Sequence, residues 1–183
     1  MNTSAKVGLI FIATILLAVG SCRKLEEYPV EPQIEYHDFV LLINQQTGIS
    51  EKGILMISYQ DGDGDIGLDQ GDTLFPYHPQ GDYYYNLIVT YYEQQFGEFV
   101  EVPLVSWNSN TQQYDTLTFS ARIPPLIDKD QEKAIKGIIE YELFIYNPLS
   151  DFDTIQFKAK LIDRALNMSN EITTPPIIRI NPN

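Results

Sequence analysis

Apolar and polar side chains alternate along most of the chain after residue 33, and the clearest run is 154–161. Every second residue of that run is apolar: Ile155, Phe157, Ala159 and Leu161. Residues 135–145 follow the same period, with apolar side chains on one face at Ile135, Ile139, Tyr141, Leu143 and Ile145. A period of two is typical of a β-strand with one buried face, whereas an amphipathic helix repeats after about 3.6 residues.

Further segments with strand composition complete the pattern: 34–43, 53–60, 84–93, 98–105, 114–122 and 171–180. Turn residues such as Phe96-Gly97 separate them. Pro175-Pro176 confines the last strand to a sheet edge, because proline has no N–H to donate to a neighbouring strand. Seven or eight strands with no amphipathic helix predict one all-β domain over residues 34–183, folded as an antiparallel β-sandwich.

The end of the chain carries a more specific pattern. Residues 162–170 read Ile-Asp-Arg-Ala-Leu-Asn-Met-Ser-Asn. This segment resembles the hairpin that closes many bacterial Ig-like domains, in which an Asp-x-Ala-x-Asn turn joins the last two strands. The resemblance implies an Ig-like or fibronectin-III-like sandwich. The chain lacks the Cys…Trp…Cys set, which excludes an antibody-type domain.

Residues 1–21 have the features of a signal peptide, and we expect a signal helix there. Lys6 precedes an uncharged, mostly apolar run from Val7 to Gly20. The run is too short to cross a bilayer comfortably, since a spanning helix needs about 20 apolar residues. A positive charge followed by a short apolar region is typical of an export signal.

The apolar run ends in Val19-Gly-Ser-Cys22, which resembles a bacterial lipobox. The resemblance implies that Cys22 is acylated, becomes the first mature residue and anchors the protein in the membrane. Residues 22–33, with Pro29 and Pro32, would then form an extended tether. Two other interpretations stay open: a buried cysteine in a cleaved signal peptide, and a short membrane anchor that is never removed.

The residues after Cys22 bear on the destination. Position 23 is Arg, whereas Asp at this position is the usual signal for retention in the inner membrane. Lys24-Leu-Glu-Glu27 resembles the export tag of surface lipoproteins in the Bacteroidota. We therefore expect an outer-membrane lipoprotein, on the periplasmic face or on the cell surface.

Composition and charge narrow the functional classes. Acidic residues outnumber basic ones 25 to 12, for a net charge of −13, and removal of the signal peptide with Lys6 makes it −14. A body this acidic is repelled by phosphate backbones, so nucleic acid is not an expected partner. The chain has a single cysteine, which excludes an internal disulfide and a zinc site built from cysteines.

The most specific internal motif is the acidic segment 61–72, Asp-Gly-Asp-Gly-Asp-Ile-Gly-Leu-Asp-Gln-Gly-Asp. Its carboxylates fall at positions 1, 3, 5, 9 and 12, which are ligand positions of a calcium loop: Asp61, Asp63, Asp65, Asp69 and Asp72. The segment is no EF-hand, because position 6 is the β-branched Ile66 and strands flank it. It resembles the Asp-x-Asp-x-Asp calcium loops of extracellular β-proteins. The alternative interpretation is a solvated acidic turn.

A second loop is expected to contribute to the same site. In an Ig-like topology the loop after the second strand and the loop between the last two strands lie at the same end. We therefore expect residues 61–72 to meet Asp163 and Asn167, whose oxygens would help to complete a calcium coordination shell of six to eight ligands. We expect this ion to be structural.

Aromatic residues cluster in the middle third of the chain, and Tyr83, Tyr85 and Trp107 are candidates for ligand binding. Their rings could stack on a sugar or pack against a protein, although aromatic residues in strands mostly fill cores. Catalysis has little support, because neither His37 nor His78 lies in a catalytic motif.

The sequence therefore predicts a non-catalytic, membrane-anchored lipoprotein of the bacterial outer envelope, with a calcium-stabilised Ig-like module for binding or structure. Asp-Gly-Asp-Gly-Asp-Ile-Gly also resembles a segment of small Bacteroidota lipoproteins with Ig-like folds, a group for which no activity is established. The alternative function is a surface glycan-binding accessory protein of an outer-membrane uptake system. The expected partner is an envelope protein or a glycan.

Overall fold

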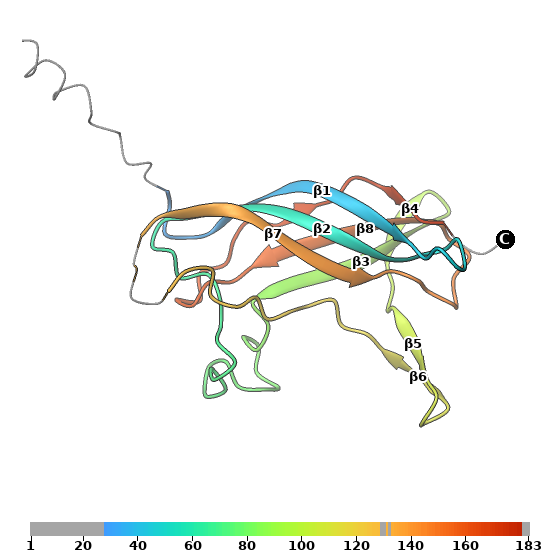
Figure 1. Cartoon of the computed structure of the whole chain (residues 1–183), viewed down its shortest axis with the longest axis horizontal. Helices are drawn as coiled ribbons and strands as arrows, with labels where there is room; N and C mark the ends of the chain where they lie inside the picture. The colour runs from blue at the N-terminus through green and yellow to red at the C-terminus, as the bar shows by residue number, and fades with distance from the viewer. Residues whose placement is uncertain (1–27, 129–130, 132, 181–183) are drawn as a thin grey trace, which may run out of the picture.

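Two antiparallel sheets face each other in the computed structural model, which describes residues 28–128, 131 and 133–180 (Figure 1). The first sheet has the strand order β1 (Gln33–Ile43), β2 (Ser50–Asp61) and β7 (Ile135–Phe144). The second has the order β10 (Ile177–Ile178), β8 (Thr154–Leu161), β3 (Leu87–Gln95) and β4 (Glu98–Glu101), and β9 (Ile172–Thr173) also pairs with β8. A separate hairpin consists of β5 (Val105–Asn108) and β6 (Gln113–Thr116).

The strand pairing is that of an Ig-like sandwich, in which the first, second and fifth strands of the pattern share one sheet and the third, sixth and seventh share the other. The all-β sandwich predicted from the sequence is confirmed. The predicted number of strands, seven to eight, is wrong, because the described residues contain ten. The expected strand 98–105 is interrupted at Pro103, and the expected strand 171–180 is interrupted at Pro175-Pro176. Prolines cannot donate to a sheet ladder, so they divide each segment into two short strands.

Alternation of apolar residues builds the core as the sequence predicts. Ile155, Phe157, Ala159 and Leu161 of β8 are all buried. The ring of Phe157 lies at the centre of the core, with its centroid 5.6 Å from Phe39 of β1 and 5.6 Å from Tyr91 of β3. Each fully buried large apolar side chain contributes about 1.5–3 kcal/mol to stability, so this shared face holds the two sheets together.

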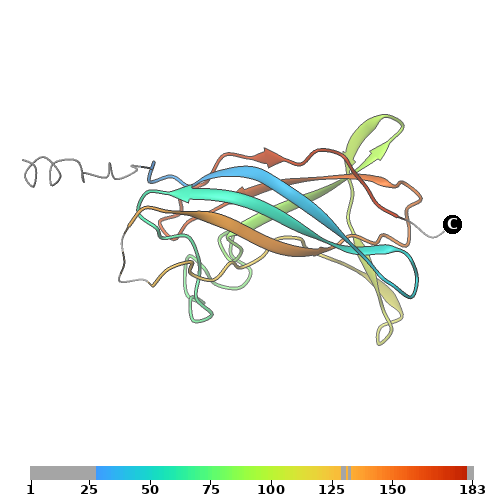
Figure 2. The ribbon, with the colours of Figure 1, turned by 45° about the horizontal axis from the view of Figure 1, so that its top comes forward.

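The sandwich has two distinct ends. At one end, which we call the N-terminal end, β1 and β7 begin, β2 and β8 end, and β3 begins. The long loop 62–86 lies at this end, whereas the β5–β6 hairpin projects near the opposite end (Figure 1 and Figure 2). We call the opposite end the distal end.

A buried ion pair closes the distal end. Glu93 of β3 is 1% exposed, Arg179 beyond β10 is 2% exposed, and their Oε1 and Nη2 atoms are 3.3 Å apart. The guanidinium also donates to the carbonyls of Ile145 (2.8 Å) and Phe152 (2.6 Å). Tyr91 Oη donates to Glu93 Oε1 at 2.8 Å. Both charges therefore have several hydrogen-bond partners, which buried charges require.

The predicted signal helix (1–21), Cys22 and the first residues of the predicted tether lie outside the described residues. Within the part of the chain that the structure describes, no helix has the length and apolarity needed to cross a membrane.

Candidate metal centre

At the end of β2, the alternation of side chains along the strand places a carboxylate in the interior. Leu55 and Ile57 point into the core, and the same alternation brings Asp61 to the inward face, where it is fully buried. Gly62 follows, and its N–H donates to the carbonyl of Pro29 at 2.8 Å. A side chain at position 62 would collide with the backbone of Tyr28 and Pro29, so only glycine fits.

The chain then turns back on itself. Gly64 has a φ of +76°, which glycine adopts readily and other residues rarely do. After this turn the N–H of Asp65 donates to Asp61 Oδ2 at 3.1 Å. Asp61, Asp63 and Asp65 each direct one carboxylate oxygen to the same place, and these oxygens lie within 4.8 Å of one another.

The Oδ1 atoms of these three aspartates are buried and have no hydrogen-bond partner among the described residues. Buried polar atoms in native proteins almost always have a partner, so three orphaned oxygens in one place require an explanation. Two oxygens bound to one calcium ion at 2.3–2.6 Å lie at most about 5 Å apart, which fits the 4.8 Å within which one oxygen of each of the three carboxylates lies. We refer to Asp61, Asp63 and Asp65 as the carboxylate group.

The electrostatics of the group favour a positive partner. Burial raises the pKa of Asp61 to about 7, with further contributions from the charges of Asp63, Asp65 and Asp163. Burial and then the charges of Asp163 and Asp63 raise the pKa of Asp65 to about 6. Without a cation, Asp61 and Asp65 therefore keep their protons to a higher pH than an ordinary aspartate does, and a bound cation would displace these protons.

The predicted meeting of the two loops is confirmed. The N–H of Ala165 donates to Asp65 Oδ2 at 2.8 Å, and the N–H of Arg164 donates to the Asp65 carbonyl at 3.2 Å. Asp163 is buried beside the carboxylate group, and burial is the main cause of its raised pKa. Its Oδ1 and Oδ2 accept hydrogen bonds from the backbone N–H and the side-chain amide of Asn167, at 2.7 and 2.9 Å. Coordination of an ion by Asp163 or Asn167 stays a prediction.

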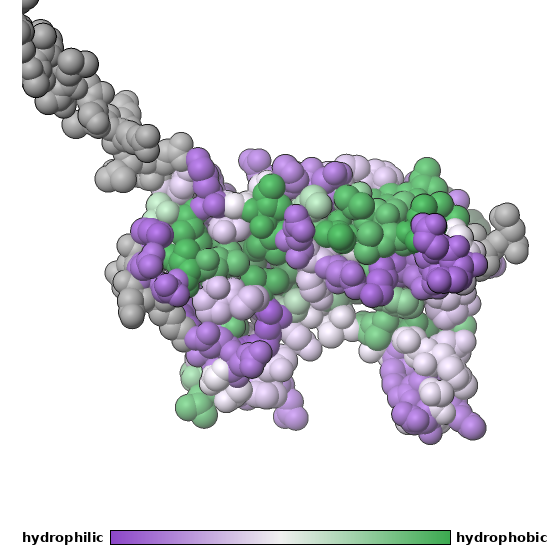
Figure 3. Space-filling model, in the orientation of Figure 1, coloured by the Kyte–Doolittle hydropathy of each residue, from purple (hydrophilic) through white to green (hydrophobic). Residues whose placement is uncertain are grey.

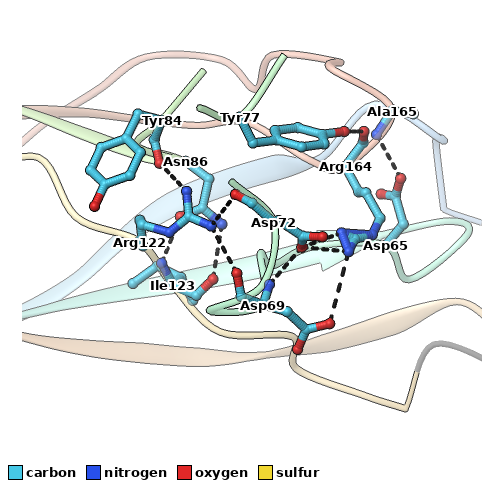
Figure 4. A network of polar contacts seen from close by, with 10 residues as sticks. All are labelled: Asp65, Asp69, Asp72, Tyr77, Tyr84, Asn86, Arg122, Ile123, Arg164 and Ala165. Carbon is cyan, nitrogen blue, oxygen red and sulfur yellow. Dashed lines mark hydrogen bonds and ion pairs between the residues drawn. The ribbon is translucent and has the colours of Figure 1, made fainter. Parts of the chain in front are cut away.

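Asp69 and Asp72 lie in the same loop but outside the carboxylate group, and Figure 4 shows them beside Arg164. Both terminal nitrogens of Arg164 lie 2.6 Å from Asp72 Oδ2, and Nη2 lies 3.9 Å from Asp69 Oδ2. Asp72 Oδ2 also accepts the N–H of Asp69 at 2.8 Å. The structure therefore gives these two carboxylates a protein cation as partner, in place of the shared ion expected from their spacing.

Sequence reasoning missed the two arginines that hold this loop. Arg164 binds the carboxylates of the loop, and Arg122 donates to the carbonyls of Tyr84 (2.6 Å), Asp69 (2.8 Å) and Asp72 (3.1 Å) (Figure 4). The role of Arg164 could have been predicted from the sequence, because Arg164 lies in the turn that was expected to meet the acidic segment. The role of Arg122 could not, since its contacts depend on the path of the loop.

A cavity of about 430 Å³ adjoins the carboxylate group. Its lining includes Asp63, Asp65, Arg164, Pro125 and Ile127. An ion held by the group would therefore have room on one side for water ligands.

The three aromatic candidates do not form one surface. Tyr83 and Tyr85 are half-buried in the loop 62–86 at the N-terminal end, whereas Trp107 lies on the β5–β6 hairpin (Figure 1). Trp107 is 54% exposed and contacts Tyr114 edge-on, with ring centroids 5.1 Å apart. The structure thus separates Trp107 from the two tyrosines.

Comparisons of the chain with protein-family models, with curated proteins and with solved structures find no match. Indications of function therefore come from the fold, the carboxylate group and the sequence motifs.

Proposed function

We propose that Asp61, Asp63 and Asp65 bind a calcium ion that stabilises a non-catalytic Ig-like module. The observation that supports this proposal is the convergence of three carboxylates, each of which has one buried oxygen without a hydrogen-bond partner among the described residues. Close carboxylates repel one another, at a cost of about 1–4 kcal/mol per pair depending on exposure. A divalent cation removes this repulsion and satisfies all three oxygens.

The ligand chemistry favours calcium. The carboxylate group offers hard oxygen ligands, which suit calcium and magnesium and not the softer transition metals. Calcium accepts six to eight oxygens in flexible geometry, whereas magnesium demands a near-ideal octahedron. Three carboxylates on one turn, with a fourth at Asp163 and an adjoining cavity for water, fit the flexible shell better.

The proposed role of the ion is stabilisation. The carboxylate group lies where the end of β2, the segment before β1 and the turn 163–167 meet. An ion at this place would hold three segments that are distant in sequence. It would also lie close to the N-terminal tether, away from a partner that approaches the distal end (Figure 1).

The module would be exported and held in the outer membrane by acylated Cys22. The lipobox resemblance at residues 19–22 supports this part of the proposal. The module would present its distal end to an envelope partner, and calcium would keep the end nearest the membrane folded.

Glycan binding is a second candidate function, favoured by the exposure of Trp107 on a projecting hairpin with Tyr114 beside it. Aromatic planes with this exposure can stack on sugar rings. Titration with neutral oligosaccharides should then quench the fluorescence of Trp107, the single tryptophan of the chain. Unchanged fluorescence across the series would exclude this function.

Thermal unfolding in calcium and in chelator tests the leading proposal. Calcium at about 100-fold excess over its Kd should stabilise the protein by about 2.7 kcal/mol, which is a few degrees for a domain of this size. A variant with Asp63→Asn and Asp65→Asn should lose the shift. Asp82→Asn is the matched control, because Asp82 is an exposed aspartate of the same loop.

Identical midpoints of the wild-type protein in calcium and in chelator would refute the metal site and leave the solvated acidic turn. An equal shift with magnesium would contradict the assignment to calcium.

A further inference from the structure

The loop 62–86 presents two large apolar side chains to solvent at its tip. Leu74 is 80% exposed and Phe75 is 87% exposed. In the space-filling view, apolar atoms form the tip of the projecting loop at the N-terminal end (Figure 3). Burial of such side chains in an apolar environment is favourable, and an apolar pair at the tip of a projecting loop marks an interaction surface.

The base of the loop is held in a fixed conformation. Arg122 donates to three loop carbonyls, and Arg164 binds Asp72 immediately before the tip. On the other side of the tip, the N–H of Tyr77 donates to the carbonyl of Leu74 at 2.7 Å, and the Tyr77 hydroxyl donates to the carbonyl of Arg164. Polar contacts therefore fix both sides of the tip and leave its apolar side chains facing outward.

The path of the chain before β1 determines what the tip can reach. The N–H of Gly62, the first residue of the loop, donates to the carbonyl of Pro29 at 2.8 Å. Only six peptide steps separate Tyr28 from Cys22. A chain of this length spans at most about 22 Å, so an acylated Cys22 keeps the N-terminal end of the domain beside the bilayer.

We propose that Leu74 and Phe75 insert into the surface of the phospholipid bilayer that holds the lipid anchor. This inference rests on the proposed acylation of Cys22. The tip would bury its apolar side chains at the boundary between headgroups and acyl chains, as interfacial segments do. The tyrosines of the same loop, Tyr77 and Tyr83, are residues that favour the membrane–water interface.

The charge of the protein selects the lipid. The chain has a net charge of −13, so anionic headgroups would be repelled. Zwitterionic phosphatidylcholine is therefore the suitable probe. The insertion would fix the orientation of the domain on the membrane, which a tether alone leaves free.

The experiment uses the protein expressed from its full-length sequence, acylated, and reconstituted into phosphatidylcholine vesicles. It compares two variants that each carry a single tryptophan as a fluorescent reporter. Trp107→Phe removes the native tryptophan, and Phe75→Trp places a reporter at the tip. The matched control is Phe96→Trp, because Phe96 is 96% exposed in the β3–β4 turn at the distal end. A shallow doxyl quencher on the lipid should lower the emission of the Phe75→Trp reporter about twofold and leave that of the Phe96→Trp reporter unchanged.

The outcomes separate this inference from the proposed anchor. Sedimentation of the protein with the vesicles measures the anchor alone, and a protein that does not sediment refutes both the anchor and the insertion. If the protein sediments and the Phe75→Trp reporter is not quenched, the insertion is refuted and the anchor stands. Equal quenching of both reporters would also refute the insertion. A tip that instead binds a soluble protein partner would leave the Phe75→Trp reporter unquenched.

Discussion

At the scale of single residues, Asp61 shows how strand geometry can place a charge where water cannot reach it. Its position follows from the phase of β2, in which residues 55, 57 and 61 face inward. Its Oδ1 has no hydrogen-bond partner among the described residues, and a buried oxygen in this state is costly unless the carboxyl binds a proton or a cation. The choice between the two depends on pH.

This choice leads to a prediction for the metal-free protein. The pKa of Asp61 rises from 3.8 to about 7 on folding, and that of Asp65 to about 6. The folded state therefore holds more protons than the unfolded state between these values, so the free energy of unfolding falls as pH rises from about 4 to about 7. In chelator, the thermal midpoint should be lower at about pH 8 than at about pH 5. Saturating calcium should remove the part of this decrease in thermal midpoint that comes from Asp61 and Asp65.

Asp61→Asn is the control for the pH prediction, because asparagine cannot ionise and its side-chain oxygen can still accept the N–H of Asp65. Its midpoint should fall less between the same two pH values. If the variant and the wild-type protein have the same pH profile in chelator, the shifted ionisation of Asp61 is refuted.

Part of the candidate metal site could be predicted from the sequence. Asp61, Asp63 and Asp65 were recognisable, because alternate carboxylates with intervening glycines can curl around one centre. Asp69 and Asp72 matched the same spacing, but Arg164 from another loop binds them. A spacing rule describes one segment and does not include a competing cation that only the tertiary fold brings near.

At the scale of elements, long strands were predictable, whereas the division of a strand segment into two short strands was not. β8 shows an unbroken alternation, which the core then buries, and β2 and β7 are long enough to show one buried face although their alternation is interrupted. The short strands β9 and β10 depend on the backbone around Pro175-Pro176 and on pairing with β8. Their local sequence lacks enough residues to show a period.

The ion pair between β3 and the segment after β10 gives a prediction at this scale. Arg179→Met would leave the carboxylate of Glu93 buried without its charged partner, so we expect a loss of about 3–5 kcal/mol in the free energy of unfolding. Urea denaturation measures this loss. Adding Glu93→Gln to the variant should recover part of it, because the uncompensated charge is then gone.

Lys52→Met serves as the comparison. Lys52 forms an exposed ion pair with Glu142, at 2.7 Å, and exposed pairs contribute roughly 0–1 kcal/mol. If Arg179→Met destabilises the protein no more than Lys52→Met does, the distal ion pair does not hold the two elements together.

At the scale of the whole molecule, the two ends carry different chemistry. The N-terminal end holds the carboxylate group and the apolar loop tip, beside the start of the chain's path to Cys22. The distal end holds the buried ion pair, and the hairpin that carries Trp107 projects near it. The proposed anchor would assign one end to the membrane and the other to partners.

The anchor itself gives the prediction for the whole molecule. Cys22→Ser removes the proposed acylation site, so the protein should move from the membrane fraction to the soluble fraction. Its calcium-dependent thermal shift should be unchanged, because the carboxylate group is intact. Lys24→Gln, which leaves the lipobox residues in place, should stay with the membranes. A Cys22→Ser protein that still fractionates with membranes would contradict the lipid anchor.

The distal ion pair also has a consequence for truncated chains. Glu93 lies in β3, but its cationic partner, Arg179, follows β10, 86 residues later in the chain. A chain cut short before residue 179 keeps the residues of strands β1–β8 but leaves the carboxylate of Glu93 buried without its cationic partner. Because proteases remove chains that spend more time unfolded, such fragments would be cleared and would not persist as smaller working domains. The stability of the sandwich thus depends on a residue that the ribosome adds only after all the strands of both sheets.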